Sequence, residues 1–323
     1  MIFGHKKNIK IFSHILAKDR FPQSVLFAGP NKVGKRKTAL EIAKYLEGHH
    51  KEDFLSFSKK DCSCESCHLI ERGNFPNVIE IKEISGDLSI KKIREIKEKL
   101  SLSSIYKYKI VIINNIEKLS SGATGALLKI LEEPGSNTIF FLLTPFPGMI
   151  MKTIISRLSV FNFFTFKREE MRSFFDYLNV KLPQFQKEKI LDISLGRPGL
   201  AKELSIDKKE FSYYISLLEN IEKLPSFPIL KRFSLAEKIE KENDKIENFL
   251  FMAKVWFRDI LLARKNNHHF SFSLEENKIK NTANYFSVDK IENILKEIQK
   301  TQKYILFSNT SRLLALENLF LSI

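Results

Sequence analysis

The sequence predicts an α/β fold with a parallel sheet in the first half of the chain and an all-helical second half. Short apolar runs at residues 25–28, 78–81, 110–113 and 139–143 suit strands that are buried on both faces. Segments with helical periodicity separate them, such as residues 89–100 (SIKKIREIKEKL). This alternation of strand and helix is typical of doubly wound domains with parallel strands.

The pattern changes near residue 167. A fifth strand is predicted at residues 160–164, and beyond it helical periodicity dominates, for example at residues 246–264 and 288–298. We therefore predict an α/β domain at residues 1–166, a short helical section at residues 167–206 and a larger helical part at residues 207–323.

Composition and charge narrow the function classes. The chain has 323 residues, of which 43% are hydrophobic and 28% charged, as in a globular protein with two or three domains. A formal net charge of +15 favours an acidic partner such as nucleic acid, and biased composition without function is the alternative. No signal peptide and no apolar run long enough to cross a bilayer are found, so we expect a cytoplasmic chain without membrane contact.

Residues 29–35 (GPNKVGK) form the most informative motif. They follow an apolar strand and precede a helical segment, which is the setting of a phosphate-binding loop. Gly29 and Gly34 let backbone N–H groups surround a phosphate, and Lys35 adds a positive charge at the start of the helix. The motif predicts binding of ATP or ADP, and a glycine loop that holds no nucleotide is the alternative.

The groups that would hold magnesium and activate water are missing. Arg36 stands where a Ser or Thr hydroxyl would ligate the metal, and Thr38 lies too far along the helix to replace it. Asn114 and Asn115 follow the strand at 110–113, where an active enzyme would carry acidic residues. Because three positions fail together, we expect this chain alone not to hydrolyse ATP, whether or not the loop holds nucleotide.

Several segments resemble the clamp-loader branch of the AAA+ superfamily, and within it the delta-prime family of bacterial DNA polymerase III. Residues 109–144 carry the resemblance, with 126–134 (ALLKILEEP) as the most specific part and Gly125 in place of a usual Asn. Residues 153–158 (TIISRL) resemble the family's SRC segment, with Leu158 in place of Cys. Further matches lie at residues 196–199 (GRPG), 255–262 and 309–321.

The resemblance implies an architecture and a role. It implies an AAA+ P-loop domain, a small helical lid and a C-terminal helical collar that joins subunits. It also implies that Arg157 reaches a neighbouring subunit's ATP phosphates. Arg197 either faces the chain's own nucleotide site or only caps a helix. The implied partners are gamma/tau-like and delta-like clamp-loader subunits, and through the assembly the sliding clamp and primed DNA. A surface arginine without function is the alternative for Arg157.

Three cysteines lie within six positions, in the segment DCSCESCH. Cys62, Cys64 and Cys67 can supply three thiolates to a structural zinc, which takes four tetrahedral ligands. The resemblance implies four cysteines here, but this chain lacks the upstream one. His49, His50 and His68 are the candidate fourth ligands, and we favour His50. A remnant with reduced thiols and no metal is the alternative.

Two other functions compete with that of a non-hydrolysing clamp-loader subunit. An ATP-hydrolysing gamma/tau-like subunit would need intact magnesium ligands, which the sequence lacks. A stand-alone nucleic-acid-binding protein would need a dense basic stripe or an aromatic platform, and neither is present. The sequence leaves open the order of subunits in the assembly.

Overall fold

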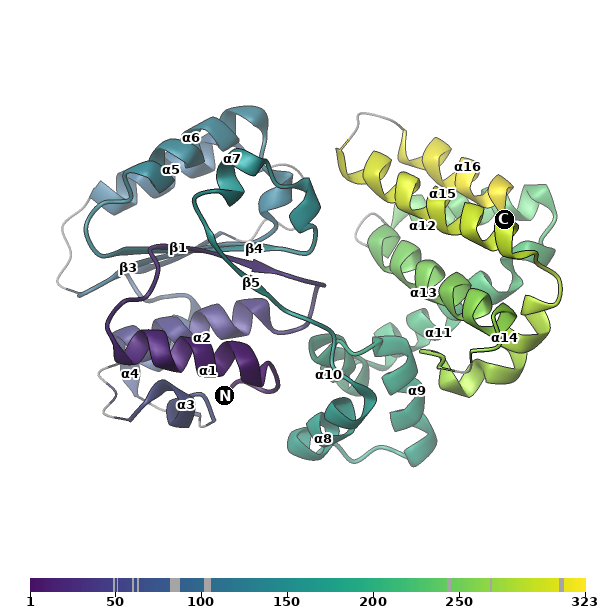
Figure 1. The fold of residues 1–323 in the computed structure, drawn as a ribbon, viewed down its shortest axis with the longest axis horizontal. Helices are drawn as coiled ribbons and strands as arrows, with labels where there is room; N and C mark the ends of the chain where they lie inside the picture. Colours follow the sequence, from purple (N-terminus) through teal and green to yellow (C-terminus); the bar gives the residue numbers. More distant parts are fainter. Residues whose placement is uncertain are drawn as a thin grey trace. The chain divides into compact units, whose positions relative to one another are not determined.

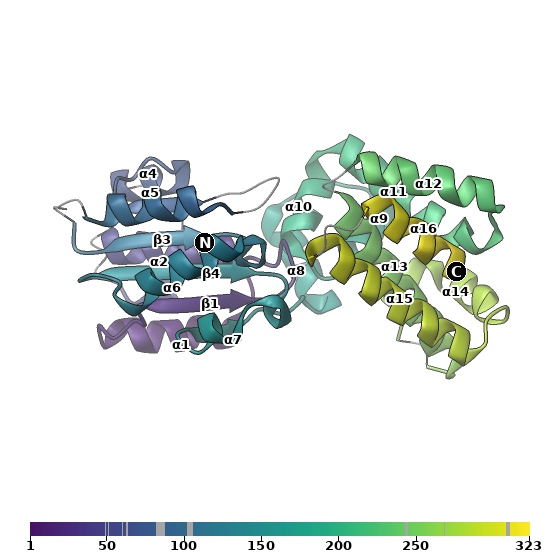
Figure 2. The same cartoon turned by 90° about the horizontal axis from the view of Figure 1, so that it is seen from above.

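The computed structural model describes residues 1–48, 50, 52–59, 61–62, 64–81, 88–101, 106–242, 245–267, 269–307 and 311–323 (Figures 1 and 2). The chain divides into two compact units. The first contains residues 1–174 together with 197–199, and the second contains residues 175–196 and 200–323. The division into three domains at 166 and 206 stays a prediction.

A five-stranded parallel sheet forms the centre of the first unit, in the order β2-β3-β4-β1-β5. Its strands are β1 (Ser24–Ala28), β2 (Val78–Ile81), β3 (Lys109–Ile113), β4 (Thr138–Thr144) and β5 (Ser159–Asn162). Strands β1 and β4 are buried along their whole length, which explains their uninterrupted apolar sequences. Strand β5 lies at the edge and is largely exposed.

Helices cover both faces of this sheet (Figure 1). One face carries α1 (Lys6–Ala17), α2 (Lys35–Glu47), α3 (Phe54–Phe57) and α4 (Glu65–Arg72). The other face carries α5 (Ile90–Ser101), α6 (Ser121–Glu132) and α7 (Lys152–Ile155). Alternate strand residues therefore enter two separate cores: Phe27 packs with the first set of helices and Leu26 with the second. Short 3₁₀ helices follow β3 and β4, at η1 (Ile116–Lys118) and η2 (Pro147–Met149).

In the described residues of the second unit, the regular secondary structure is helical. This unit begins within α8 (Arg168–Leu178). Its further helices are α9 (Gln184–Ser194), most of α10 (Pro198–Ile206), α11 (Lys208–Lys223), α12 (Ile229–Lys241), α13 (Ile246–Arg264), α14 (Glu276–Ala283), α15 (Val288–Phe307) and α16 (Arg312–Ser322), with 3₁₀ turns η3 (Leu224–Ser226) and η5 (Ser273–Glu275). Helix α13 packs against α14 and α15 and contributes the fully buried Trp256.

Two buried carboxylates fasten the segment before α14 inside the second unit. Asp192 of α9 accepts hydrogen bonds from the Leu274 N–H at 2.7 Å and the Ser273 hydroxyl at 3.1 Å. Asp259 of α13 accepts bonds from the N–H groups of Ser271 at 2.7 Å and Phe272 at 3.0 Å. Burial raises the pKa of Asp259, although these bonds and Arg258 oppose that effect. Because both carboxylates are fully buried, the joint between α9, α13 and this segment is a fixed part of the core.

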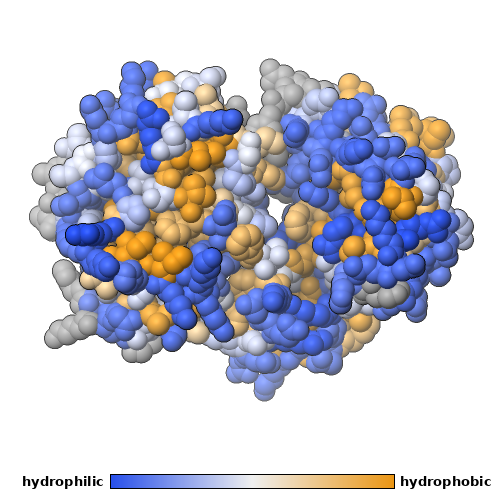
Figure 3. Space-filling view, in the orientation of Figure 1, coloured by the Kyte–Doolittle hydropathy of each residue, from blue (hydrophilic) through white to orange (hydrophobic). Residues whose placement is uncertain are grey.

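The structure confirms the predicted fold class, an α/β domain with a parallel sheet followed by helices. Residues 78–81 and 246–264 form a strand and a helix with the predicted bounds. The fifth strand ends at Asn162, two residues before the predicted end, and the next residue, Phe163, is buried. Among the described residues, no helix is both long enough and apolar enough to cross a lipid bilayer. Figure 3 shows exposed apolar residues in separate patches on both units, surrounded by hydrophilic side chains.

Candidate functional site

The predicted phosphate loop lies at the carboxyl end of β1 and leads directly into α2. Two of its positions require glycine. Gly29 has a φ of 148° and an added Cβ would lie 2.0 Å from the Phe163 carbonyl oxygen, while Gly34 has a φ of 109°. The neighbours of β1 are β4 and β5, and the chain connections from β1 and β4 run toward opposite sides of the sheet. Ligands of open α/β sheets bind at such a switch point.

The side chain of Lys35 forms hydrogen bonds within the phosphate loop. Its Nζ donates hydrogen bonds to the carbonyl oxygens of Gly29 and Pro30, the latter at 2.8 Å. The side chain is buried, and this burial lowers the pKa of Lys35 to about 8, while the charge of Glu117 acts in the opposite direction. A bound phosphate would supply the counter-charge that the carbonyls provide only in part.

We expect one lysine of the chain to titrate near pH 8 in a carbon NMR titration of lysine Cε resonances, well below the ordinary value of 10.5. That resonance should be absent from Lys35→Met and retained in Lys37→Met. Between about pH 8 and 10.5 the unfolded lysine still binds its proton whereas the folded one does not, so the free energy of unfolding should rise with pH in this window. A Lys35 resonance that titrates at 10 or above would contradict the buried position.

An internal ion pair involves two of the positions where a hydrolysing enzyme would carry its magnesium ligands. Arg36, the second residue of α2, forms a bidentate ion pair with Glu80 of β2. Its Nε donates to Oε1, and its Nη2 donates to Oε2 at 2.7 Å. Asn114, which follows β3, donates to Glu80 Oε1 at 3.1 Å and to the Ile81 carbonyl at 3.0 Å. The bonds to Glu80 raise the pKa of Arg36 despite its burial, so the guanidinium stays charged.

Thr38 and Glu117 are also engaged in hydrogen bonds within the same unit. The Thr38 hydroxyl donates to the Gly34 carbonyl at 3.0 Å and points back along α2. Glu117 accepts a hydrogen bond from the Thr144 hydroxyl at 2.7 Å. Asn115 has a φ of 54°, a left-handed conformation that Asn tolerates well, and it begins the 3₁₀ turn that carries Glu117. The sequence analysis did not single out Glu80 or Glu117. The signal for Glu80 was a carboxylate within an otherwise apolar strand.

The GRPG segment lies against the phosphate loop. The Gly199 N–H donates to the Lys32 carbonyl at 2.8 Å, and a Cβ at Gly199 would lie 2.9 Å from that oxygen. Arg197 is only 4% exposed. Residues 197–199 accordingly group with the first unit, although they are distant from it in sequence. The structure thus brings Arg197 to the same unit as Gly29, Gly34 and Lys35.

Arg157 lies just after α7 and turns toward the end of α6. Its Nη2 donates to Glu132 Oε1 at 2.5 Å, and its Nη1 donates to the Thr153 carbonyl at 2.7 Å. The side chain remains 37% exposed. Within the described part of the chain, its hydrogen bonds involve α6, α7 and the neighbouring Ser156, and not the phosphate loop.

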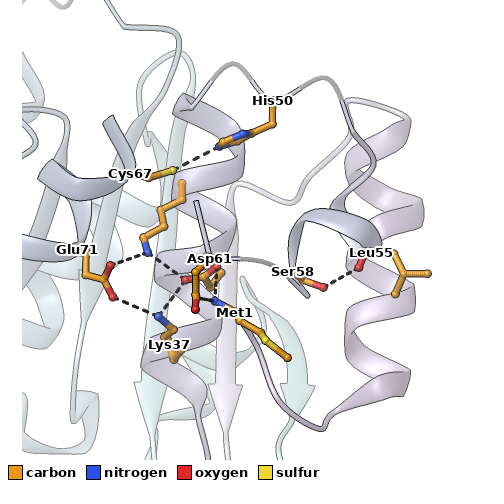
Figure 4. Close-up of polar contacts among 10 residues, drawn as sticks. Met1, Lys37, His50, Leu55, Ser58, Asp61, Cys67 and Glu71 are labelled. Atoms are coloured by element: carbon orange, nitrogen blue, oxygen red, sulfur yellow. Dashed lines mark hydrogen bonds and ion pairs between the residues drawn. The ribbon is translucent and has the colours of Figure 1, made fainter. Parts of the chain in front are cut away.

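The four predicted metal ligands come together in space. The ligand atoms of His50, Cys62, Cys64 and Cys67 all lie within 4.8 Å of one another. Figure 4 shows Cys67 and His50 directed toward each other, with 3.4 Å between Sγ and Nε2. A tetrahedron of 2.3 Å zinc–sulfur bonds has edges of about 3.8 Å, so a small contraction would complete a Cys₃His site. His68 is not in this group, and His49 lies outside the described residues.

The surroundings of the cluster hold its ligands in place. The His50 ring packs on Phe57 with 4.2 Å between ring centroids, and a Cβ at Gly48 would lie 2.2 Å from His50 Nε2. Burial tends to raise the pKa of the Cys64 thiol, but hydrogen bonds from Cys67, Cys62 and the first turn of α4 lower it overall. Burial and the neighbouring thiols raise the pKa of Cys67. A zinc ion would take up both groups as thiolates and release their protons.

Ion pairs fasten α4, which carries Cys67, to α2, which begins at the phosphate loop (Figure 4). Glu71 of α4 accepts from Lys37 at 3.3 Å and from Lys44 at 3.2 Å. Both lysines also contact the buried Glu41, at 3.1 and 3.2 Å. The cluster of His50 and the three cysteines is therefore attached to the same helix as the phosphate loop.

The strand–loop–helix arrangement at the end of a parallel sheet defines a P-loop α/β fold. The sequence model described as "DNA polymerase III, delta subunit" matches residues 4–167, which is 164 of 323 residues. The chain belongs to this family, and the resemblance to DNA polymerase III subunits is confirmed.

Individual relatives carry names of more than one subunit type. DNA polymerase III subunit tau of Bacillus subtilis is 35% identical over 164 residues, covering 50% of this chain and 28% of the relative. DNA polymerase III subunit delta' of the same organism is 35% identical over 156 residues, covering 46% and 44%. The matches thus span less than half of these relatives. A crystal structure of a gamma subunit-related protein from Thermotoga maritima aligns with a TM-score of 0.39 and 18% identity, over 97% of both chains.

Proposed function

We propose that this chain is a non-hydrolysing, delta-prime-like subunit of a DNA polymerase III clamp loader. In this role it binds gamma/tau-like and delta-like subunits and supports loading of the sliding clamp on primed DNA. It contributes through its place in the assembly and catalyses no reaction by itself. It supplies Arg157 to the ATP site of a neighbouring subunit. Family membership and the likeness to a delta' subunit support the assembly and its partners.

The observation that carries the non-hydrolysing role is the contact of Arg36 and Asn114 with Glu80. A magnesium ion at the phosphate loop needs oxygen ligands with negative or partial negative charge. Here the guanidinium of Arg36 takes the place of such a ligand, and the carboxylate of Glu80 is engaged by it and by Asn114. A second cation in this region would be repelled by Arg36 and would find Glu80 already paired.

An ATP-hydrolysing gamma/tau-like subunit is the second candidate, because a tau subunit is as similar in sequence as a delta' subunit. The two candidates differ in one measurable property, turnover by the isolated chain. A structural zinc held by Cys62, Cys64, Cys67 and His50 is compatible with both, since the four ligands leave no open position for catalysis.

The purified chain alone should show no magnesium-dependent ATP hydrolysis above the background of its Lys35→Ala variant. The physical reason is that Arg36 replaces the magnesium ligand, and that Asn114 and Asn115 cannot orient an attacking water as carboxylates would. Phosphate release with and without magnesium, in the presence of primed DNA, measures this directly.

Turnover that depends on magnesium and disappears in Lys35→Ala would refute the proposal and establish the hydrolysing alternative. Binding of ATP or ADP without turnover would agree with it, because Gly29, Gly34 and Lys35 retain the loop geometry.

A further inference from the structure

We propose that Glu132 is a positioning residue for Arg157, holding its guanidinium in the orientation from which it contacts the neighbour's phosphates. This inference rests on the proposed role of Arg157 in trans. Glu132 itself would contact neither nucleotide nor clamp.

The contacts around Arg157 fix the guanidinium and still leave donors available. Glu132 Oε1 accepts from Nη2 at 2.5 Å, and the Thr153 carbonyl accepts from Nη1 at 2.7 Å. An arginine has five N–H donors in a planar fork. Among the described residues, nothing accepts a hydrogen bond from the Nε–H of Arg157. The Ser156 hydroxyl also accepts from Nη1, at 3.5 Å, so both terminal nitrogens are held, while the Nε–H and the second hydrogen of Nη2 can meet an anion.

Glu132 and Arg157 both lie next to residues of the same hydrophobic core. Leu131, which precedes Glu132, and Ile154, in the turn before Arg157, are 7% and 2% exposed and belong to the same core cluster. The Arg157 N–H also donates to the Ile154 carbonyl at 3.1 Å. The backbone on both sides of the ion pair is thus fixed, and the carboxylate selects one orientation of a long side chain that would otherwise sample many.

The position of Glu132 is unfavourable for its own helix. It is the last residue of α6, where the helix dipole presents partial negative charge and disfavours a carboxylate. An ion pair with side chains 37% and 49% exposed adds little to stability, because water screens it. A residue that opposes local preference without a clear gain for the fold points to function.

The test uses the complete clamp loader reconstituted with the partner subunits of the same organism, with ATPase measured in the presence of clamp and primed DNA. Glu132→Ala should lower, by about threefold to tenfold, the part of kcat that Arg157→Ala abolishes, because misplacing a catalytic group by about 1 Å costs up to about 100-fold. KM for ATP should change less than twofold, since the guanidinium acts on charge that develops in the transition state. Glu133→Ala is the matched control and should leave kcat unchanged.

Two further variants separate positioning from a structural role. Glu132→Gln keeps an acceptor oxygen and should recover most of the lost kcat. Glu132→Ala combined with Arg157→Ala should be no slower than Arg157→Ala alone, because Glu132 acts only through the arginine.

An unchanged or increased kcat in Glu132→Ala would overturn the inference while leaving the role of Arg157 intact. So would an equal loss in Glu133→Ala, or an additive loss in the double variant. If Arg157→Ala itself leaves kcat unchanged, the proposed function in trans fails, and the inference fails with it.

Discussion

Replacing Arg157 by alanine should leave the fold and the assembly intact and should sharply lower ATP hydrolysis at the one site beside this chain. The side chain is partly exposed and contributes little to the core, so stability should hardly change. Arginines that act in trans on phosphoryl transfer contribute factors of about 10³–10⁵ at their site. The measurement is clamp- and DNA-stimulated ATPase of the reconstituted complex, together with the rate of clamp loading.

Because other sites of the assembly remain intact, total hydrolysis should fall partially unless the sites act in a coupled order. Lys152→Ala, which removes another exposed cation of the same segment, serves as the control and should have no effect. Arg157→Lys should recover little, since an ammonium lacks the planar fork of donors. A complex with Arg157→Ala that assembles and hydrolyses ATP at the unmodified rate would exclude a role in trans.

The second large effect concerns the cluster of His50 and the three cysteines. Elemental analysis of reduced, full-length protein should find about one zinc per chain. Cys64→Ser should remove the metal and lower the free energy of unfolding of the first unit on the order of 3–5 kcal/mol, because the folded state loses the binding free energy of a structural metal. Zinc content and urea unfolding, with and without a strong chelator, measure both quantities.

Two histidine variants test the ligand set. His50→Ala should lose zinc, whereas His68→Ala should retain it, since His68 lies on α4 outside the cluster. Protein that never contains zinc, with a stability that the chelator does not alter, would show that the cysteines are a remnant without metal.

The sequence was sufficient for the features with a strong local signal. Buried parallel strands are apolar on both faces, so β2 could be placed to the residue, and the glycine loop is recognisable because its backbone tolerates few alternatives. The cluster of His50 with the three cysteines could also be predicted, because three thiols within six positions lack one ligand for zinc and His68 is badly placed directly beside Cys67.

Features that depend on contacts between distant segments could not be predicted. Glu80 precedes Asn114 by more than thirty residues, and the pairing of β2 with β3 brings the two together. The contact of Glu80 with Arg36 depends in addition on the packing of α2 against the sheet. The contact of Arg157 with Glu132 could not be predicted either, because the two residues lie on separate segments. The sequence analysis noted Glu132 only as part of a family motif. The packing of Gly199 on Lys32 likewise arises from the tertiary fold and not from a local pattern.

The buried joint around Asp192 has a mechanical consequence. This carboxylate belongs to the predicted lid, yet it is bonded to the backbone and side chain of residues in the predicted collar. Lys189, one turn earlier, is paired with Glu275 next to it. Breaking these contacts would leave buried charges without partners, which is costly. The joint between α9 and the segment before α14 is therefore rigid, and a tilt of α9 would move the predicted collar helices with it as one rigid body.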